Sequence, residues 1–422
     1  MAIPTLACSC SLPPPPPLLR PIKTLAESVV RSPPPPTPAP SALHRPVESL
    51  RRGDWVKLIC GAGFEDAADV RNLSLVYTLA GVDCIDCAAE ASVVSAVNEG
   101  IDAALSIASV GRPWVMISVN DDREDVHFRK AEFNPEDCPV DCSRPCERVC
   151  PANAISLQRV SGEDEYTRNT TIKVQGGVIT ERCYGCGRCF PVCPYDKIRS
   201  VTYVRDPTST CELLKRDDVD AIEIHTSGRR TDLFNELWNS LSNSVGHVKL
   251  VAVSLPDVGE STVSVMNTMY SIMKARLQCY NLWQLDGRPM SGDIGRGATR
   301  EAIAFAVHMA AKRDKPHGFC QLAGGTNSHT VDSLKRVGLF QATTIPETFP
   351  DIATSLIGCP QAVIGGIAYG GYARKIVGRV LSKLPMHDGH AHIEDYPGFL
   401  LEALREALAL VGPVKSFNLP PL

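Results

Sequence analysis

Short runs of apolar residues recur along the chain from residue 55 onward. In the run at 55–60 (WVKLIC) and the run at 114–119 (WVMISV), apolar residues are nearly continuous and do not alternate with polar ones. Such runs are typical of strands in parallel sheets, because helices cover both faces of the sheet. Eight runs have this character, at 55–60, 81–88, 114–119, 220–225, 249–255, 279–286, 317–323 and 361–368.

Segments with helical spacing of apolar residues separate most of these runs. The third run is the exception, because a cysteine-rich segment follows it instead. Eight strand–helix repeats predict an α/β protein with a (β/α)8-like barrel, and an open doubly wound sheet is the alternative. The predicted helices lie at 67–79, 92–107, 231–241, 261–275 and 298–312, with a C-terminal helix at 398–410.

Eight of the 17 cysteines lie between residues 138 and 193, in two groups that each end in Cys-Pro. The first group is Cys138, Cys142, Cys146 and Cys150, and the second is Cys183, Cys186, Cys189 and Cys193. The second group has the spacing C-x2-C-x2-C-x3-C-P, which bacterial ferredoxins use to bind [4Fe–4S] clusters. Zinc sites usually combine two CxxC pairs across a longer gap, and reducing compartments disfavour structural disulfides. The spacing therefore favours iron and sulfide over these two alternatives.

The two groups together predict a ferredoxin-like module that binds two [4Fe–4S] clusters. In such modules the fourth cysteine of each group serves the other cluster. Cys138, Cys142, Cys146 and Cys193 would then hold one cluster, and Cys183, Cys186, Cys189 and Cys150 the other. The first group has gaps of three residues throughout, so its cluster is the less regular one.

The motifs divide the chain into four parts. Residues 48–120 and 207–422 form the two barrel parts, and residues 121–206 form the ferredoxin-like insertion after the third strand. Residues 1–47 are rich in proline and serine, carry Glu27 as their one acidic residue, and are predicted to be a disordered plastid transit peptide. The expected location is the chloroplast stroma. The sequence contains no run of 18 apolar residues, so no membrane span is predicted. A formal net charge of -4 argues against nucleic-acid binding through a broad basic face.

Glycine-rich loops follow the last three predicted strands. In barrels a phosphate site often lies in this region, because backbone N–H groups at helix starts bind anions. These loops predict a site for FMN or another phosphate-bearing ligand, although glycines after strands also serve plain turns. The candidate residues are Gly324, Gly325, Thr326, Asn327, Tyr369, Gly370, Gly371, Arg288 and Arg296.

Several polar residues stand near the ends of the predicted strands. They are Asp86, Cys87, His225, Gln284, Asp286 and Gln321. His225 is a candidate acid or base, but a histidine in such a position is more often a hydrogen-bonded core residue. Cys84 and Cys87 point to opposite sides of a strand and are expected to fill space as small apolar groups.

Several phrases of the sequence resemble the light-dependent period protein A family of cyanobacteria and plastids. They are GDWVKLICGA at 53–62, RNLSLVYTLAGVDCIDCAA at 71–89, CERVCPANAI at 146–155, and QLDGRPMSGDIG with GATR within 284–300. The resemblance covers about residues 53–380. It implies an iron–sulfur protein that senses redox state and adjusts circadian period to light.

Three functions are compatible with these observations. The first is a redox-sensing or electron-transfer protein with a redox partner such as ferredoxin or quinone and a regulatory protein partner. Arg144, Arg148, Arg182 and Arg188 would then dock an acidic ferredoxin. The second is an oxidoreductase in which the clusters feed a flavin at the barrel top. In the third, the clusters have a purely structural role and only stabilise the insertion.

Overall fold

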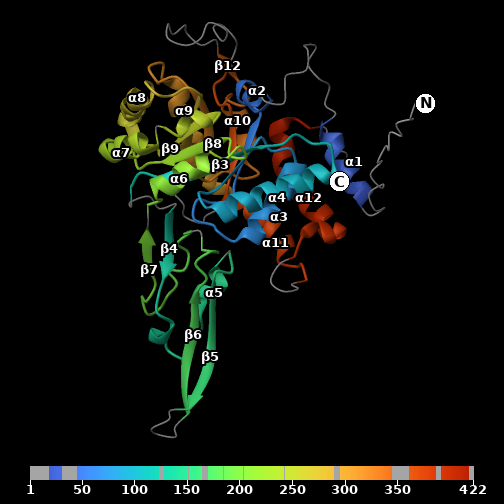
Figure 1. Cartoon of the computed structure of the whole chain (residues 1–422), viewed down its shortest axis with the longest axis vertical. Coiled ribbons are helices and arrows are strands. Elements are labelled where there is room, and N and C mark those ends of the chain that lie inside the picture. Colours follow the sequence, from blue (N-terminus) through green and yellow to red (C-terminus); the bar gives the residue numbers. More distant parts are fainter. Residues whose placement is uncertain are drawn as a thin grey trace, which may run out of the picture.

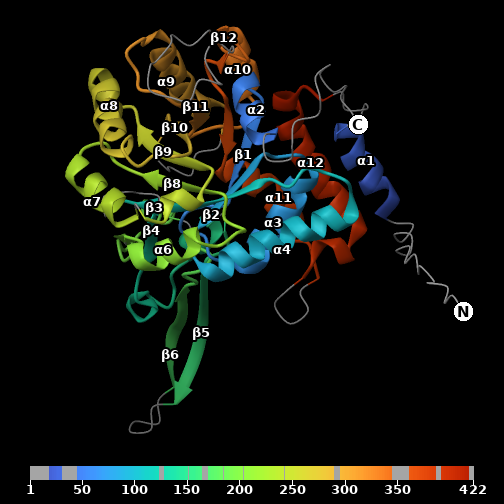
Figure 2. The same cartoon turned by 45° about the horizontal axis from the view of Figure 1, so that its top comes forward.

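Eight parallel strands close into a barrel, as the apolar runs predict, and the alternative of an open sheet is wrong. The computed structural model describes residues 19–30, 45–122, 128–150, 152–163, 170–183, 185–202, 204–241, 243–288, 295–344, 361–385 and 391–417. The barrel strands are β1 (Trp55–Ile59), β2 (Cys84–Ala88), β3 (Trp114–Asn120), β8 (Ala221–His225), β9 (Leu250–Pro256), β10 (Tyr280–Asp286), β11 (Phe319–Ala323) and β14 (Gly366–Tyr369) (Figures 1 and 2).

The barrel closes where β1 pairs with β14. Trp55 lies opposite Gly366, and on the other side of β1 Lys57 lies opposite Cys84 of β2. The eighth apolar run is not one strand, because its first residues form β13 (Gln361–Ala362). That strand pairs with β12 (Thr343–Thr344) outside the barrel.

Helices follow the barrel strands and cover the outside of the barrel. The third strand also has its helix, α6, which comes after the insertion and which the sequence analysis did not predict. Pro207 at its first turn and Asp206, whose side chain accepts a hydrogen bond from Ser209 N, start this helix. The barrel helices are α3 (Ala67–Leu79), α4 (Ala91–Ile107), α6 (Pro207–Leu214), α7 (Thr231–Leu241), α8 (Thr262–Met273), α9 (Thr299–Ala311), α10 (Thr330–Arg336) and α11 (Gly371–Leu381).

Two further helices precede β1, and one ends the described chain. They are α1 (Arg20–Val30), α2 (Arg45–Arg52) and α12 (Pro397–Lys415). Ile22 and Ala26 of α1 are fully buried, and α1 lies beside α12 (Figure 2). The predicted disorder of the leader is therefore wrong for α1, while residues 1–18 and 31–44 lie outside the described residues. Within the described ranges, no helix combines the length and apolar character that crossing a membrane requires.

Apolar residues of the barrel form two cores, one on each side of the barrel wall, and a third, smaller core lies in the insertion. Outward-facing residues such as Val56, Ile85 and Ile222 pack against the surrounding helices. Inside the barrel, Trp55, Cys84, Trp114 and others fill the end at which the strands begin. The inward-facing residues nearer the strand C-termini are polar, as described below.

The insertion leaves the barrel after β3 and returns at α6. It contains β4 (Arg129–Glu132), a 3-10 turn at Pro135–Asp137, α5 (Pro145–Val149), β5 (Ile155–Glu163), β6 (Thr170–Val178) and β7 (Arg199–Thr202). β4 and β7 pair antiparallel near the barrel, and β5 and β6 form a hairpin paired from Ile155–Val178 to Glu163–Thr170. This hairpin points away from the barrel (Figure 1).

Closure of the barrel depends on a glycine at residue 366. A Cβ atom there would lie 2.2 Å from the carbonyl oxygen of Trp55. We expect Gly366→Ala to lower the free energy of unfolding by about 1–3 kcal/mol, because β14 must move away from β1. Urea unfolding followed by tryptophan fluorescence would measure this. Gly378→Ala in α11 is the control, since no atom lies within 4 Å of the added Cβ and the helix should gain up to ~1 kcal/mol. An equal effect of both changes would contradict the prediction.

Candidate iron–sulfur centre and the barrel mouth

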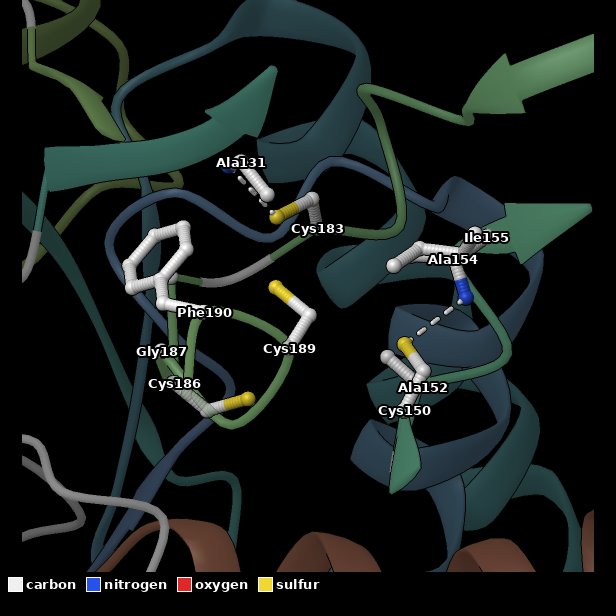
Figure 3. Close-up of a pocket in the computed structure, with 11 residues that line it drawn as sticks. Ala131, Cys150, Ala152, Ala154, Ile155, Cys183, Cys186, Gly187, Cys189 and Phe190 are labelled. Atoms are coloured by element: carbon white, nitrogen blue, oxygen red, sulfur yellow. Dashed lines mark hydrogen bonds between the residues drawn. The ribbon is translucent and has the colours of Figure 1, made fainter. Parts of the chain in front are cut away.

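Four cysteines from both halves of the insertion surround one cavity. Cys150 of the first group lines it together with Cys183, Cys186 and Cys189 of the second group. The cavity has a volume of about 380 Å³ including its open mouth. In Figure 3 the four sulfur atoms face the same space. These are the four ligands predicted for one cluster, although Cys150 and Cys183 are far apart in the chain.

Backbone N–H groups fix the directions of several thiols. Ala131 N on β4 donates to Cys183 Sγ at 3.3 Å, and Ala154 N donates to Cys150 Sγ at 3.2 Å (Figure 3). Cys150 caps the C-terminus of α5, which orients its side chain toward the second group. Such N–H···S bonds stabilise thiolate ligands and tune the potential of a cluster that they bind.

Two glycines let the second cysteine loop lie close to β4. Gly185 and Gly187 both have φ of +75°, and Cβ atoms there would lie 2.2 Å from Arg129 O and 2.6 Å from Arg129 Nη2. Arg129 holds the same loop through a 2.8 Å bond from its Nε to Gly185 O. Its guanidinium lies 5.6 Å from the ring centroid of Phe190. The glycines are therefore required by the approach of Arg129 to the loop.

The other four predicted ligands also lie near one another. Burial raises the pKa of Cys138, and the neighbouring thiols of Cys142 and Cys193 raise it further. The pKa of Cys146 is likewise raised, first by burial and then by Cys138 and Cys142. Arg144 N and Lys197 N donate to Cys142 Sγ and Cys193 Sγ, each at 3.4 Å. Cys193 is thus grouped with the first cysteines, as the predicted exchange of ligands requires.

The chemistry of these residues fits an iron–sulfur cluster. Burial and the thiols of Cys186, Cys183 and Cys150 raise the pKa of Cys189 to about 12. Iron must displace these protons when it binds, because the thiolate is the ligand. A bound cluster would accept and release single electrons. None of the described cysteines forms a disulfide, and no three described His, Cys, Asp or Glu side chains are arranged around a single-ion site.

A network of ion pairs joins the insertion to the loop between β1 and α3. Glu65 pairs with Lys130 at 3.0 Å and with Arg205 at 2.8 Å, so it contacts both the outgoing and the returning arm of the insertion. Lys130 Nζ also donates to Thr180 O at 2.7 Å. Arg182, next to Cys183, donates to Asp66 at 2.7 Å. The loop that carries Cys183 is therefore fixed to the barrel mouth.

Below this junction, the upper interior of the barrel is polar and almost fully buried. Glu223 is central: it pairs with Lys57, lies 2.9 Å from His225 Nε2, and accepts a 2.9 Å bond from Gln284. Gln284 in turn accepts from Gln321 at 2.7 Å. We call this set the interior polar layer; it consists of Lys57, Asp86, Ser118, Glu223, His225, Ser254, Gln284, Asp286 and Gln321, each at most 6% exposed.

The sequence analysis found only part of the interior polar layer. It singled out Asp86, His225, Gln284, Asp286 and Gln321, and the structure brings these together. Cys87 lies instead in the outer core, where it packs as an apolar group. Lys57 and Glu223 were missed, because each stands alone within an apolar run. The signal for them was a charged residue at the centre of a strand that is buried on both faces.

The carboxyl groups of this layer differ in pKa. Burial alone would raise the pKa of Glu223, but the charge of Lys57 and the hydrogen bond from His225 outweigh it and lower this pKa to about 2. Burial raises the pKa of Asp86 to about 6, against the opposing charge of Lys57 and with the support of Glu223. Asp86 accepts a 2.6 Å bond from Ser118 Oγ, while its Oδ2 lies 4.0 Å from Lys57 Nζ.

The loops predicted to bind a phosphate contact one another. Cβ atoms on Gly324 and Gly325 would lie 2.7 Å from Arg288 O and 2.1 Å from Ala298 O, so these glycines allow the loops to pack closely. Thr326 Oγ1 donates to Ala368 O at 2.5 Å. Arg288 pairs with Glu301 at 2.6 Å.

Further described residues of these loops also take part in packing or in bonds between the loops. Asn327 Nδ2 donates to Gly295 O at 2.8 Å. Tyr369 is buried in the outer core, and Gly370 and Gly371 lead into α11. Arg296 begins a 3-10 turn, and residues 289–294 lie outside the described residues. The geometry of these loops accounts for most of the predicted residues by packing, and a bound phosphate stays a prediction.

Among the arginines expected to dock an acidic ferredoxin, Arg144 and Arg182 use their side chains for contacts within the chain. Arg144 donates to Leu157 O, and Arg182 binds Asp66. Their contribution to a docking surface is correspondingly smaller. Arg148 is exposed and Arg188 half-buried, and both stay candidates for such a surface.

The pKa of Asp86 gives a specific pH dependence. A folded-state pKa of about 6 exceeds the unfolded value of 3.8, so the folded protein binds more protons between these values. The contribution of Asp86 to stability therefore falls as pH rises through this window and is constant above it. We expect the unfolding free energy of Asp86→Asn, relative to the unchanged protein, to rise by about 1 kcal/mol between pH 5 and 8. Urea titrations at several pH values would measure it, and a difference that is constant with pH would contradict it.

Comparisons with known proteins agree with the site. The model of the LdpA Fe-S cluster-binding domain matches residues 138–204, and that of the Light dependent period A C-terminal domain matches residues 213–413. The protein Light dependent period A of Synechococcus elongatus is 38% identical over 371 residues, covering 88% of this chain and 94% of that protein. The first match assigns an iron–sulfur cofactor to the insertion. The chain belongs to the light dependent period A family.

Proposed function

We propose that this chain is an iron–sulfur protein of the chloroplast stroma that senses redox state and passes it to a protein partner. In this proposal the insertion holds two [4Fe–4S] clusters, one bound by Cys150, Cys183, Cys186 and Cys189. Cys138, Cys142, Cys146 and Cys193 bind the other. A one-electron carrier such as ferredoxin, or a quinone, sets the oxidation state of the clusters.

The observation that carries the proposal is the cavity shared by Cys150 and the second cysteine group. A single-cluster site built from one cysteine group would not require Cys150 to leave its own group. The proline- and serine-rich leader supports import into a plastid. The name of the Synechococcus relative supports a link to light and circadian period, which we include in the proposal as the process that the redox signal regulates.

A second candidate function is an oxidoreductase that works at the barrel mouth. The interior polar layer favours it, because barrels that are filled only for stability use mainly branched apolar residues there. A flavin such as FMN at the loops after β10, β11 and β14 would be its cofactor. In this case the clusters would supply electrons to the barrel.

The exchange of ligands between the two cysteine groups is directly testable. We expect Cys150→Ser to abolish the same EPR signal of the dithionite-reduced protein as Cys186→Ser, because both remove a ligand of one cluster. Cys193→Ser should instead act like Cys138→Ser. Cys211→Ser on α6, outside the module, is the control and should leave both signals unchanged. If Cys150→Ser acts like Cys138→Ser, the ligands do not cross between the groups.

Analysis of the purified, anaerobic protein separates the candidate functions. Two clusters predict about eight irons and eight sulfides per chain, and one cluster predicts about four. Reversible bleaching by dithionite, together with altered capture of a plastid protein partner, is the expected result for a sensor. Flavin released on denaturation would favour the oxidoreductase. Iron that is present but cannot be reduced would contradict both.

A further inference from the structure

The interior polar layer carries more acidic than basic side chains, although it is shielded from water. Asp86, Glu223 and Asp286 are at most 6% exposed, and among the described side chains of the layer Lys57 is the one ammonium group. Buried charges that are not balanced by an opposite charge are costly. A layer of this kind is expected to bind something positive, and a proton is the smallest such ligand.

One carboxylate oxygen of Asp86 has no hydrogen-bond donor among the described residues. Its Oδ1 accepts the hydrogen bond from Ser118. Its Oδ2 is fully buried and accepts no hydrogen bond from any described group, and the ammonium of Lys57 lies 4.0 Å away in contact with Glu223 instead. A buried carboxylate oxygen that receives no hydrogen bond can be stabilised by binding a proton.

A short structural path joins this layer to the cluster-binding cavity. The ring of Phe128 packs edge-on against His225, with ring centroids 5.5 Å apart. Three residues later, Ala131 N bonds Cys183 Sγ. Three extended residues span about 10 Å, so with the two contacts and the length of the Phe128 side chain the layer and the cavity are within roughly 20–25 Å of each other. Over this distance in a protein interior, one added electron changes proton affinity by roughly threefold to fourfold.

We propose that Asp86 is a proton-binding site whose occupancy is linked to reduction of the cluster held by Cys150, Cys183, Cys186 and Cys189. When the cluster takes one electron from a one-electron carrier, the proton affinity of Asp86 rises, and in a fraction of the molecules its carboxylate takes one proton from solvent and forms an O–H bond. Oxidation of the cluster returns the electron and releases the proton. This inference rests on the iron–sulfur function proposed above and deepens it.

The other titratable groups that face Asp86 keep their charge state. Burial raises the pKa of Cys60 to about 12 and raises those of Cys84 and Cys87 well above the usual range, so these thiols stay neutral. Burial opposes the charged form of Lys57, but Glu223 and Asp86 outweigh it and raise this pKa, so Lys57 stays an ammonium. The groups that face Asp86 are Lys57 from β1, Cys60 after it, Cys84 and Cys87 from β2, and Glu223 and His225 from β8. His225 carries an imidazole, so the experiment must separate its protonation from that of Asp86.

Infrared difference spectroscopy of the cluster-loaded protein, oxidised and then reduced with dithionite near pH 6.5, distinguishes Asp86 from His225. Protonation of Asp86 creates the C=O band of a carboxylic acid, whereas protonation of an imidazole does not. We expect this band to appear on reduction, together with uptake of a fraction of one proton per electron. Both should vanish in Asp86→Asn at unchanged iron and sulfide content.

Two further variants keep the test decisive. All comparisons are made in an Asp69→Asn background, because Asp69 in α3 also has a pKa raised to about 6 by burial and Asp66, and it interacts with Arg182 next to Cys183, so its own protonation on reduction must be removed. The Asp69→Asn protein should retain the band. Ser118→Ala removes the hydrogen-bond donor that stabilises the ionised Asp86 carboxylate. This variant should move proton uptake to higher pH, and it tests the site even if Asp86→Asn does not fold. A band that survives in Asp86→Asn, disappears in Asp69→Asn, or never forms while the cluster is reduced would overturn the inference. A cluster that cannot be reduced would instead contradict the proposed function.

Discussion

One carboxylate, Glu65, holds both arms of the insertion against the barrel. Lys130 belongs to the outgoing arm and Arg205 to the returning arm, and both side chains are nearly buried. Removal of a partner from a buried ion pair typically costs about 3–5 kcal/mol, because the remaining charge stays desolvated. Rotation of the insertion would break both pairs at once. Glu65 is therefore a central contact for the orientation of the cysteine-lined cavity relative to the barrel mouth, and the pairs of Arg205 with Glu90 and of Arg182 with Asp66 support it.

The neighbouring pair extends this constraint to the cysteine loop. Asp66 accepts from Arg182 with one oxygen, and with the other it caps α3 through a 3.1 Å bond from Asp69 N. Arg182 directly precedes Cys183, so the start of a barrel helix and the neighbour of a predicted cluster ligand share one aspartate. A change of charge or position at the cysteine loop would therefore act on the ion pair of Asp66, which also caps α3. This physical link is what a sensor requires, and it is independent of what the barrel itself binds.

The fold was readable from the sequence because parallel strands are covered on both faces and give continuous apolar runs. The cysteine spacing likewise indicated the insertion and the proximity of Cys150 to the second cysteine group. Lys57 and Glu223 were not readable, because inward and outward positions look alike when both faces are buried. The glycine loops left their prediction untested, since local sequence does not distinguish a glycine at an anion site from one that meets Arg288 or Ala298. The burial of Ile22 depends on α12, far away in the chain.

The contacts within the interior polar layer explain why the pKa values of Glu223 and Asp86 shift in opposite directions. Lys57 lies between Glu223 and Asp86 and cannot compensate both fully. Glu223 also receives bonds from His225 and Gln284, whereas Asp86 receives one from Ser118. Glu223, which has more partners, stays ionised with a pKa lowered to about 2. Asp86 has fewer partners, and its pKa rises toward neutrality, to about 6. Enzymes separate a fixed charge from a proton carrier in this way. The asymmetry arises from the number of donors that the neighbouring strands supply, so it is a property of the barrel and exists before any cluster is reduced.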